Sequence, residues 1–206
     1  MKFNWANQFT ILRMLLIIPF VICMLKINNP ELGTTMRHIA TAIYLFMAIS
    51  DGIDGYLART KKLVTKLGAF LDPVADKLLI TCACLLLVSQ RGQIKDFHLP
   101  TTVVVLIIGK DLFLVIGFII VYFITSKFLI APAFIGKTAN ALQLSMVAAI
   151  LIAPEVSTAL PGWIWFLRVL WWSAAGTAII ATLIYIRIGS QYVEKYEQSS
   201  ANNVNK

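Results

Sequence analysis

Four aspartates stand at regular intervals in a short stretch of a chain that is otherwise strongly apolar. Asp51 and Asp54 are three residues apart, and Asp72 and Asp76 are four residues apart. On a helix, either spacing places both carboxylates of a pair on one face. Only 10 of the 206 residues are acidic and 59% are hydrophobic, so these carboxylates need compensation if they lie near lipid.

A bound cation is the simplest compensation for such a group. If the two helices pack side by side, the four carboxylates converge, and like charges a few Å apart cannot all stay ionised without cations between them. Oxygen ligands favour hard divalent ions. We therefore expect two divalent ions, Mg²⁺ or Mn²⁺, held by Asp51, Asp54, Asp72 and Asp76. Each aspartate alone could equally be a helix cap or an ion-pair partner, whereas the four together favour a metal site.

The residues between the two aspartate pairs suit a phosphate ligand. Gly55, Ala58 and Gly68 allow a ligand or backbone to approach closely. Arg59 offers a planar guanidinium that matches phosphate oxygens. Together they predict a diphosphate held beside the metal ions, although Gly55 alone could serve helix packing and Gly68 alone could mark a helix start.

Apolar runs long enough to cross a membrane must position these residues. A mean hydropathy of +0.80 and a charged fraction of 14% exclude an ordinary soluble domain. Six runs of sufficient length lie at about residues 9–25, 39–58, 68–90, 101–125, 134–153 and 162–186. We expect an all-α, polytopic integral membrane protein whose six transmembrane helices form one bundle.

The sequence predicts one membrane domain followed by a tail. Residues 1–190 form the domain, and residues 191–206 have the polar composition of a disordered terminus. Lys and Arg are retained on the cytoplasmic side, and they are richer on the side of the termini and of the loops near 59–66 and 126–137. The aspartates and both termini are therefore expected to face the cytoplasm at the cell (inner) membrane.

The net charge of +8 indicates the kind of partner. Because the basic residues are dispersed along the membrane edges, they favour anionic lipid headgroups as partners and argue against nucleic acid.

The pattern DxxDGxxAR, eight residues, then GxxxDxxxD resembles the signature of the CDP-alcohol phosphatidyltransferase family. Members transfer a phosphatidyl or related group from a CDP-linked donor to an alcohol and release CMP. The resemblance implies that Asp51, Asp54 and Asp72 hold one metal ion, and that Asp51, Asp72 and Asp76 hold or flank the second. It also implies Asp76 as the general base for the acceptor hydroxyl, and a homodimer as the assembly.

The resemblance also implies a pocket for the CDP group. Its lining residues would be Gly55, Ala58, Arg59 and Gly68. The segment WANQFTILRML looks like the first helix of the family, which adds Asn7 and Thr10 to the pocket, with Arg13 spaced by three along the same face. Arg13 could equally anchor the chain at the membrane surface.

Two lysines are candidates for binding the acceptor. Lys110 interrupts the fourth run in LIIGKDLFL, and Lys137 opens the fifth in FIGKTANALQL. An intramembrane lysine is costly and so is a functional candidate, although an ion pair between Lys110 and Asp111 is a structural alternative. The two lysines resemble the phosphate-binding pair of relatives that use glycerol 3-phosphate. The first of these positions commonly lies in a GRE sequence in those relatives, whereas this chain has GKD.

These lysines favour an anionic acceptor. The expected donor is CDP-diacylglycerol, and the acceptor that suits the lysines best is glycerol 3-phosphate, as in the phosphatidylglycerophosphate synthases. Phosphatidylglycerol is the alternative acceptor, because residues 126–156 and 165–189 are similar to cardiolipin synthases of the same superfamily. A membrane cation transporter is the alternative of another class. The clustering of the carboxylates between glycines and an arginine favours the enzyme.

Overall fold

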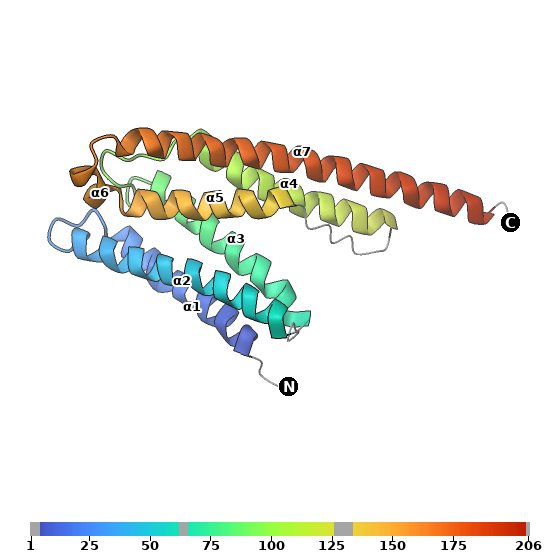
Figure 1. The fold of residues 1–206 in the computed structure, drawn as a ribbon, viewed down its shortest axis with the longest axis horizontal. Coiled ribbons are helices and arrows are strands. Elements are labelled where there is room, and N and C mark those ends of the chain that lie inside the picture. Colours follow the sequence, from blue (N-terminus) through green and yellow to red (C-terminus); the bar gives the residue numbers. More distant parts are fainter. Residues whose placement is uncertain (1–4, 62–65, 126–133, 205–206) are drawn as a thin grey trace.

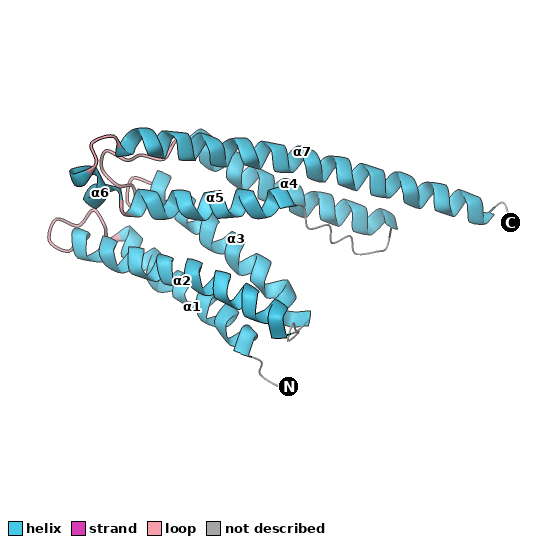
Figure 2. Cartoon of the chain, viewed as in Figure 1, coloured by secondary structure: helices cyan, strands magenta, loops and turns pink. Residues whose placement is uncertain are grey.

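The computed structural model describes residues 5–61, 66–125 and 134–204, and within these ranges the chain forms helices and connecting loops only (Figures 1 and 2). The expected all-α class is thereby confirmed. The helices are α1 (Trp5–Leu25), α2 (Gly33–Lys61), α3 (Lys66–Val88), α4 (Thr101–Thr125), α5 (Phe134–Leu151), α6 (Ala153–Ala159) and α7 (Trp163–Val204).

The six apolar runs of the sequence correspond to α1 to α5 and α7. Among the described residues, α4 and the part of α7 from Trp163 to Glu194 are long and apolar enough to cross a membrane. Helices α5 and α6, bent by 70° at their junction, would make a third span. The protein thus has helices suited to a membrane, and the exact number of six spans stays a prediction.

Pro154 lies in the first turn of α6, where a missing N–H costs nothing. The C-terminal part of the chain differs from the sequence expectation. Residues 191–206 were expected to form a disordered tail, but α7 continues to Val204. Extending an existing helix needs no new nucleus, so polar residues such as Gln191 and Glu194 can prolong it.

The long helices form two groups that share one core. Helix α1 packs against α2 and α3, while α7 packs against α4 and α5; α3 joins the groups through contacts with α4 and α5 (Figure 1). Tyr44 of α2 is fully buried, stacks on Phe20 of α1 at 5.8 Å between ring centroids, and donates its hydroxyl to the Leu144 carbonyl of α5 at 3.0 Å. Side chains of three helices therefore meet at this tyrosine.

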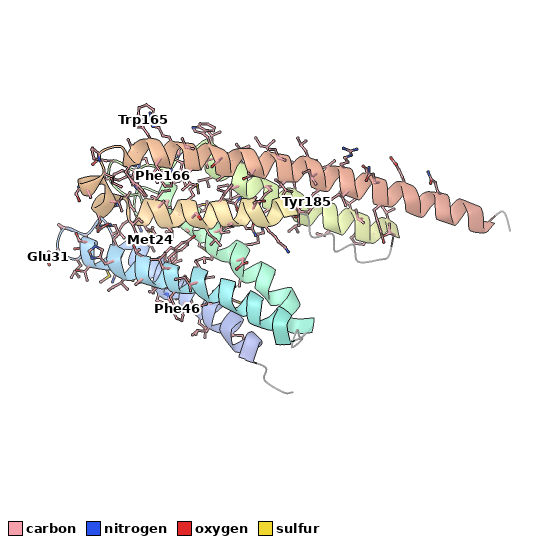
Figure 3. The ribbon with its side chains drawn as sticks, in the orientation of Figure 1. Met24, Glu31, Phe46, Trp165, Phe166 and Tyr185 are labelled. Carbon is pink, nitrogen blue, oxygen red and sulfur yellow. The ribbon has the colours of Figure 1, made fainter. Side chains whose placement is uncertain are left out.

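Large apolar side chains also cover the outside of the bundle. Trp165 of α7 and Phe46 of α2 point away from the helices on opposite sides (Figure 3), with 66% and 51% of their surfaces exposed. Exposed apolar residues at this density are costly in water and favourable in lipid. The outer surface therefore fits a membrane environment.

An ion pair fixes the end of the bundle at which α2 begins. Arg37 donates to Glu155 of α6, with 2.6 Å between Nη1 and Oε2, and to the Leu151 carbonyl at the end of α5 at 3.1 Å. His38, an exposed residue of α2, lies with its Nε2 2.6 Å from Glu155 Oε1. The bend between α5 and α6 is thus held against the first turns of α2.

Candidate active site

Helices α2 and α3 carry the aspartates at matching distances from their connection. Asp51 lies ten residues before the end of α2 at Lys61, and Asp76 lies ten residues after the start of α3 at Lys66. By the same arithmetic, Asp54 is seven residues and Asp72 six residues from those ends. At 1.5 Å per residue, Asp51 and Asp76 each lie about 15 Å, and Asp54 and Asp72 each about 10 Å, along their helices from the α2–α3 connection.

Most predicted ligands of the metals and of CDP are located by backbone alone. At eight of these positions the structure describes only the helical backbone: Asn7, Asp51, Asp54, Gly55, Ala58, Arg59, Gly68 and Asp72. The metal site and the CDP pocket therefore stay predictions. Thr10, the remaining predicted CDP contact, is buried on α1, one turn before Arg13.

Asp76 makes an ion pair with Arg13. Arg13 Nη1 of α1 donates to Asp76 Oδ1 of α3 at 2.9 Å, with 2% of the arginine side chain and 21% of the aspartate side chain exposed. The buried position of Arg13 argues against its alternative role as an anchor at the membrane surface. A guanidinium fixes the orientation of a carboxylate through directed N–H groups, so α1 positions the predicted base.

The next residue on α3, Lys77, points to a different set of helices. Its ammonium donates to Asp111 Oδ1 of α4 and to Asn140 Oδ1 of α5, the latter at 3.2 Å. Lys110 Nζ lies 3.0 Å from the same Asp111 oxygen and donates to Asn140 Oδ1 at 3.3 Å. We call these four residues the lysine cluster: Lys77, Lys110, Asp111 and Asn140.

The lysine cluster contains two cations and one anion. Lys110 is almost entirely buried, and its pairing with Asp111 bears out the structural alternative considered for it. That pairing does not neutralise the cluster, because Lys77 shares the same carboxylate. Among the described residues, these side chains therefore carry a formal charge of +1 between α3, α4 and α5.

Lys137, the second predicted acceptor residue, is exposed near the start of α5. It lies three residues before Asn140, so the two side chains are neighbours on the helix surface. The role of Lys110 and Lys137 in binding the acceptor stays a prediction.

Sequence analysis did not single out Asn140, nor the contacts of Lys77. The available signal was the spacing of Lys137, Asn140 and Gln143, three polar residues at intervals of three in a mostly apolar helix.

The family model for CDP-alcohol phosphatidyltransferases matches residues 3–186. The chain belongs to the CDP-alcohol phosphatidyltransferase family. This membership confirms the resemblance drawn from the aspartate motif. As a CDP-alcohol phosphatidyltransferase, the protein is a membrane transferase of phospholipid biosynthesis, and the interpretation as an enzyme is favoured over that as a cation transporter.

Three similar relatives of this CDP-alcohol phosphatidyltransferase share the name CDP-diacylglycerol--glycerol-3-phosphate 3-phosphatidyltransferase. The protein of Bacillus subtilis is 35% identical over 158 residues, which cover 73% of this chain and 77% of that protein. The protein of Pseudomonas fluorescens is 41% identical over 109 residues, 53% of this chain and 51% of the relative. The protein of Haemophilus influenzae is 42% identical over 92 residues, 44% of this chain and 46% of the relative.

Proposed function

We propose that the protein transfers the phosphatidyl group of CDP-diacylglycerol to glycerol 3-phosphate and releases CMP. The observation that carries the choice of acceptor is the lysine cluster, in which Lys77 and Lys110 share the single carboxylate of Asp111. The names of the relatives agree with this acceptor. Asp76 and Lys77 are consecutive residues of α3, so the proposed base and the lysine cluster lie at the same height along that helix.

The charge of the cluster favours a phosphomonoester as its ligand. Each ammonium group has three N–H donors, and among the described residues each lysine uses two of them on Asp111 and Asn140. The remaining donors, with the exposed Lys137, suit the dianionic phosphate of glycerol 3-phosphate. The phosphodiester of phosphatidylglycerol carries only one negative charge, so it would gain less from this site.

Two divalent ions, Mg²⁺ or Mn²⁺, belong to this proposal. Their ligands would be Asp51, Asp54, Asp72 and Asp76, whose carboxylate oxygens suit hard cations and which lie six to ten residues from the α2–α3 connection on their helices. When bound, such ions neutralise the diphosphate and stabilise charge on the departing CMP.

Asp76 is proposed to accept the proton of the acceptor's primary hydroxyl. The hydroxyl oxygen forms a bond to the phosphorus that carries diacylglycerol, and the bond from this phosphorus to the oxygen of CMP breaks, so CMP leaves with the electron pair. Arg13 keeps the Asp76 carboxylate in place through its 2.9 Å contact. A positioned base of this kind typically contributes about 10²–10⁴ in rate.

Orientation and assembly complete the proposal. The active site and both termini face the cytoplasm at the cell (inner) membrane, a placement supported by the distribution of Lys and Arg. The protein is proposed to act as a homodimer, as the family resemblance implies.

CMP release from CDP-diacylglycerol by the detergent-solubilised protein tests the enzymatic activity. With Mg²⁺ present, we expect release to depend on glycerol 3-phosphate and to be slow without an acceptor. If no acceptor in a panel that includes phosphatidylglycerol supports CMP release, while reconstituted vesicles show ion flux, the proposed function is wrong.

A further inference from the structure

Gln143 of α5 is a buried polar residue that the mechanism does not use. Its side chain has no exposed surface, and among the described residues neither Nε2 nor Oε1 has a hydrogen-bond partner. Buried amides are almost always hydrogen-bonded, and one without a partner is destabilising. A ligand or water that completes these hydrogen bonds would explain why glutamine stands here in an apolar helix.

The position of Gln143 points to the acceptor site. Lys137, Asn140 and Gln143 follow one another at intervals of three, so their side chains are successive neighbours on α5. Lys137 is exposed, Asn140 is half-buried and Gln143 is fully buried. Since Asn140 accepts hydrogen bonds from both lysines of the cluster, Gln143 lies one turn deeper than the cluster along the same row.

Asp111 of the lysine cluster also has a buried atom without a hydrogen-bond partner in the described part of the chain. Both lysines contact Oδ1 of Asp111, whereas Oδ2 of that carboxylate is buried and accepts no hydrogen bond. An ionised carboxylate only accepts hydrogen bonds, while a glutamine amide both donates and accepts. A dianionic phosphate cannot donate to Asp111 Oδ2, but a hydroxyl group can.

We propose that Gln143 and Asp111 Oδ2 bind the hydroxyl of the acceptor that does not react. This inference rests on the proposed function. Glycerol 3-phosphate has a phosphate, a primary hydroxyl and a secondary hydroxyl. The lysines suit the phosphate and Asp76 suits the primary hydroxyl, so the secondary hydroxyl is the group left for Gln143 and Asp111. These two residues then select for an acceptor with a hydroxyl at its central carbon.

The test compares two acceptors that differ only in that hydroxyl. 3-Hydroxypropyl phosphate keeps the phosphate and the reacting primary alcohol of glycerol 3-phosphate but lacks the secondary alcohol. The wild-type protein should prefer glycerol 3-phosphate by roughly tenfold or more in kcat/KM, because a site built to bind a hydroxyl rejects analogues without it. The ratio of the two values on one preparation does not depend on the fraction of active protein.

Gln143→Met keeps the length of the side chain and removes both hydrogen-bonding groups. We expect it to bring the ratio closer to unity, chiefly through a lower kcat/KM for glycerol 3-phosphate, while Asp111 Oδ2 retains part of the preference. Ser145→Ala, on an exposed face of α5, is the control and should keep the wild-type ratio. Should Gln143→Met fail to fold, Gln143→Asn should fold and show an intermediate ratio.

The outcomes separate this inference from the proposed function. If wild-type protein uses neither acceptor, the proposed function itself is wrong. If wild-type protein uses glycerol 3-phosphate but shows no preference over the analogue, or if the Gln143 variants keep the wild-type ratio, Gln143 has only a structural role and the inference is overturned.

Discussion

Arg13 and Asp76 form an ion pair across 63 residues of sequence, with Nη1 and Oδ1 separated by 2.9 Å. Because the arginine side chain is only 2% exposed, the pair is shielded from the aqueous screening that weakens surface salt bridges. The contact links α1 to α3 at the residue proposed as the general base. Helix α1 therefore serves the reaction by orienting that base.

Arg13→Gln should lower kcat by about 10- to 100-fold, because the Asp76 carboxylate loses its orienting partner and its neighbouring positive charge. The measurement is the steady-state rate of CMP release, with thermal unfolding in detergent recorded in parallel. Arg168→Gln is the matched control, since Arg168 is an exposed arginine of α7 that stacks on Trp165. A variant at Arg13 with the wild-type kcat would show that the ion pair does not support the base.

Asp76→Asn should abolish turnover while the protein stays folded, because an amide cannot accept the proton of the acceptor hydroxyl. CMP release and the midpoint of thermal unfolding measure the two effects. Asp96→Asn is the control: Asp96 is exposed, lies in the loop between α3 and α4, and has a positive φ of 68° that asparagine tolerates. Near-normal rates in Asp76→Asn would remove Asp76 from the mechanism.

Lys137→Ala should raise the KM for glycerol 3-phosphate by about tenfold and leave the KM for CDP-diacylglycerol within about twofold. Loss of one charge-assisted contact to phosphate gives an effect of this size. Initial rates with each substrate varied in turn provide the measurement, and Lys95→Ala, an exposed lysine in the loop between α3 and α4, is the control. An unchanged acceptor KM would favour phosphatidylglycerol as acceptor or a different pocket.

Gly136→Ala should destabilise the protein by about 1–3 kcal/mol, because a Cβ at this position would lie 2.2 Å from the Tyr185 hydroxyl oxygen of α7 (Figure 3). Tyr185→Phe in the same chain should restore much of the lost stability, since the next ring atom lies 3.3 Å away. Thermal unfolding of the single and double variants measures the coupling. Gly109→Ala, where a Cβ meets nothing within 4 Å, is the control.

An additive effect in the Gly136 and Tyr185 double variant would contradict close packing between the start of α5 and α7. Coupled effects, in which the double variant is more stable than the sum of the singles predicts, would support it.

The sequence predicted the elements well because each long helix is a nearly continuous apolar run. The spacing of Asp51, Asp54, Asp72 and Asp76 also predicted that two helices carry them in pairs, and α2 and α3 each carry one pair within ten residues of the helix end. Such local spacings follow from helix geometry alone.

Contacts between helices were not predictable in the same way. Lys77 meets Asp111 at 34 residues and Asn140 at 63 residues along the chain, and the sequence does not say which helices are neighbours. Asn140 and Gln143 appeared as ordinary polar residues in KTANALQL, and only their burial and contacts drew attention to them. The continuation of α7 to Val204 was missed because a polar composition is shared by disordered tails and solvated helices.

The identity of the lipid product tests the central claim most directly. Purified protein receives radiolabelled CDP-diacylglycerol and Mg²⁺ with glycerol 3-phosphate or phosphatidylglycerol in parallel, and the lipids are separated by thin-layer chromatography. We predict labelled phosphatidylglycerol phosphate with glycerol 3-phosphate and little product with phosphatidylglycerol. Labelled cardiolipin from phosphatidylglycerol, with no product from glycerol 3-phosphate, would contradict the account.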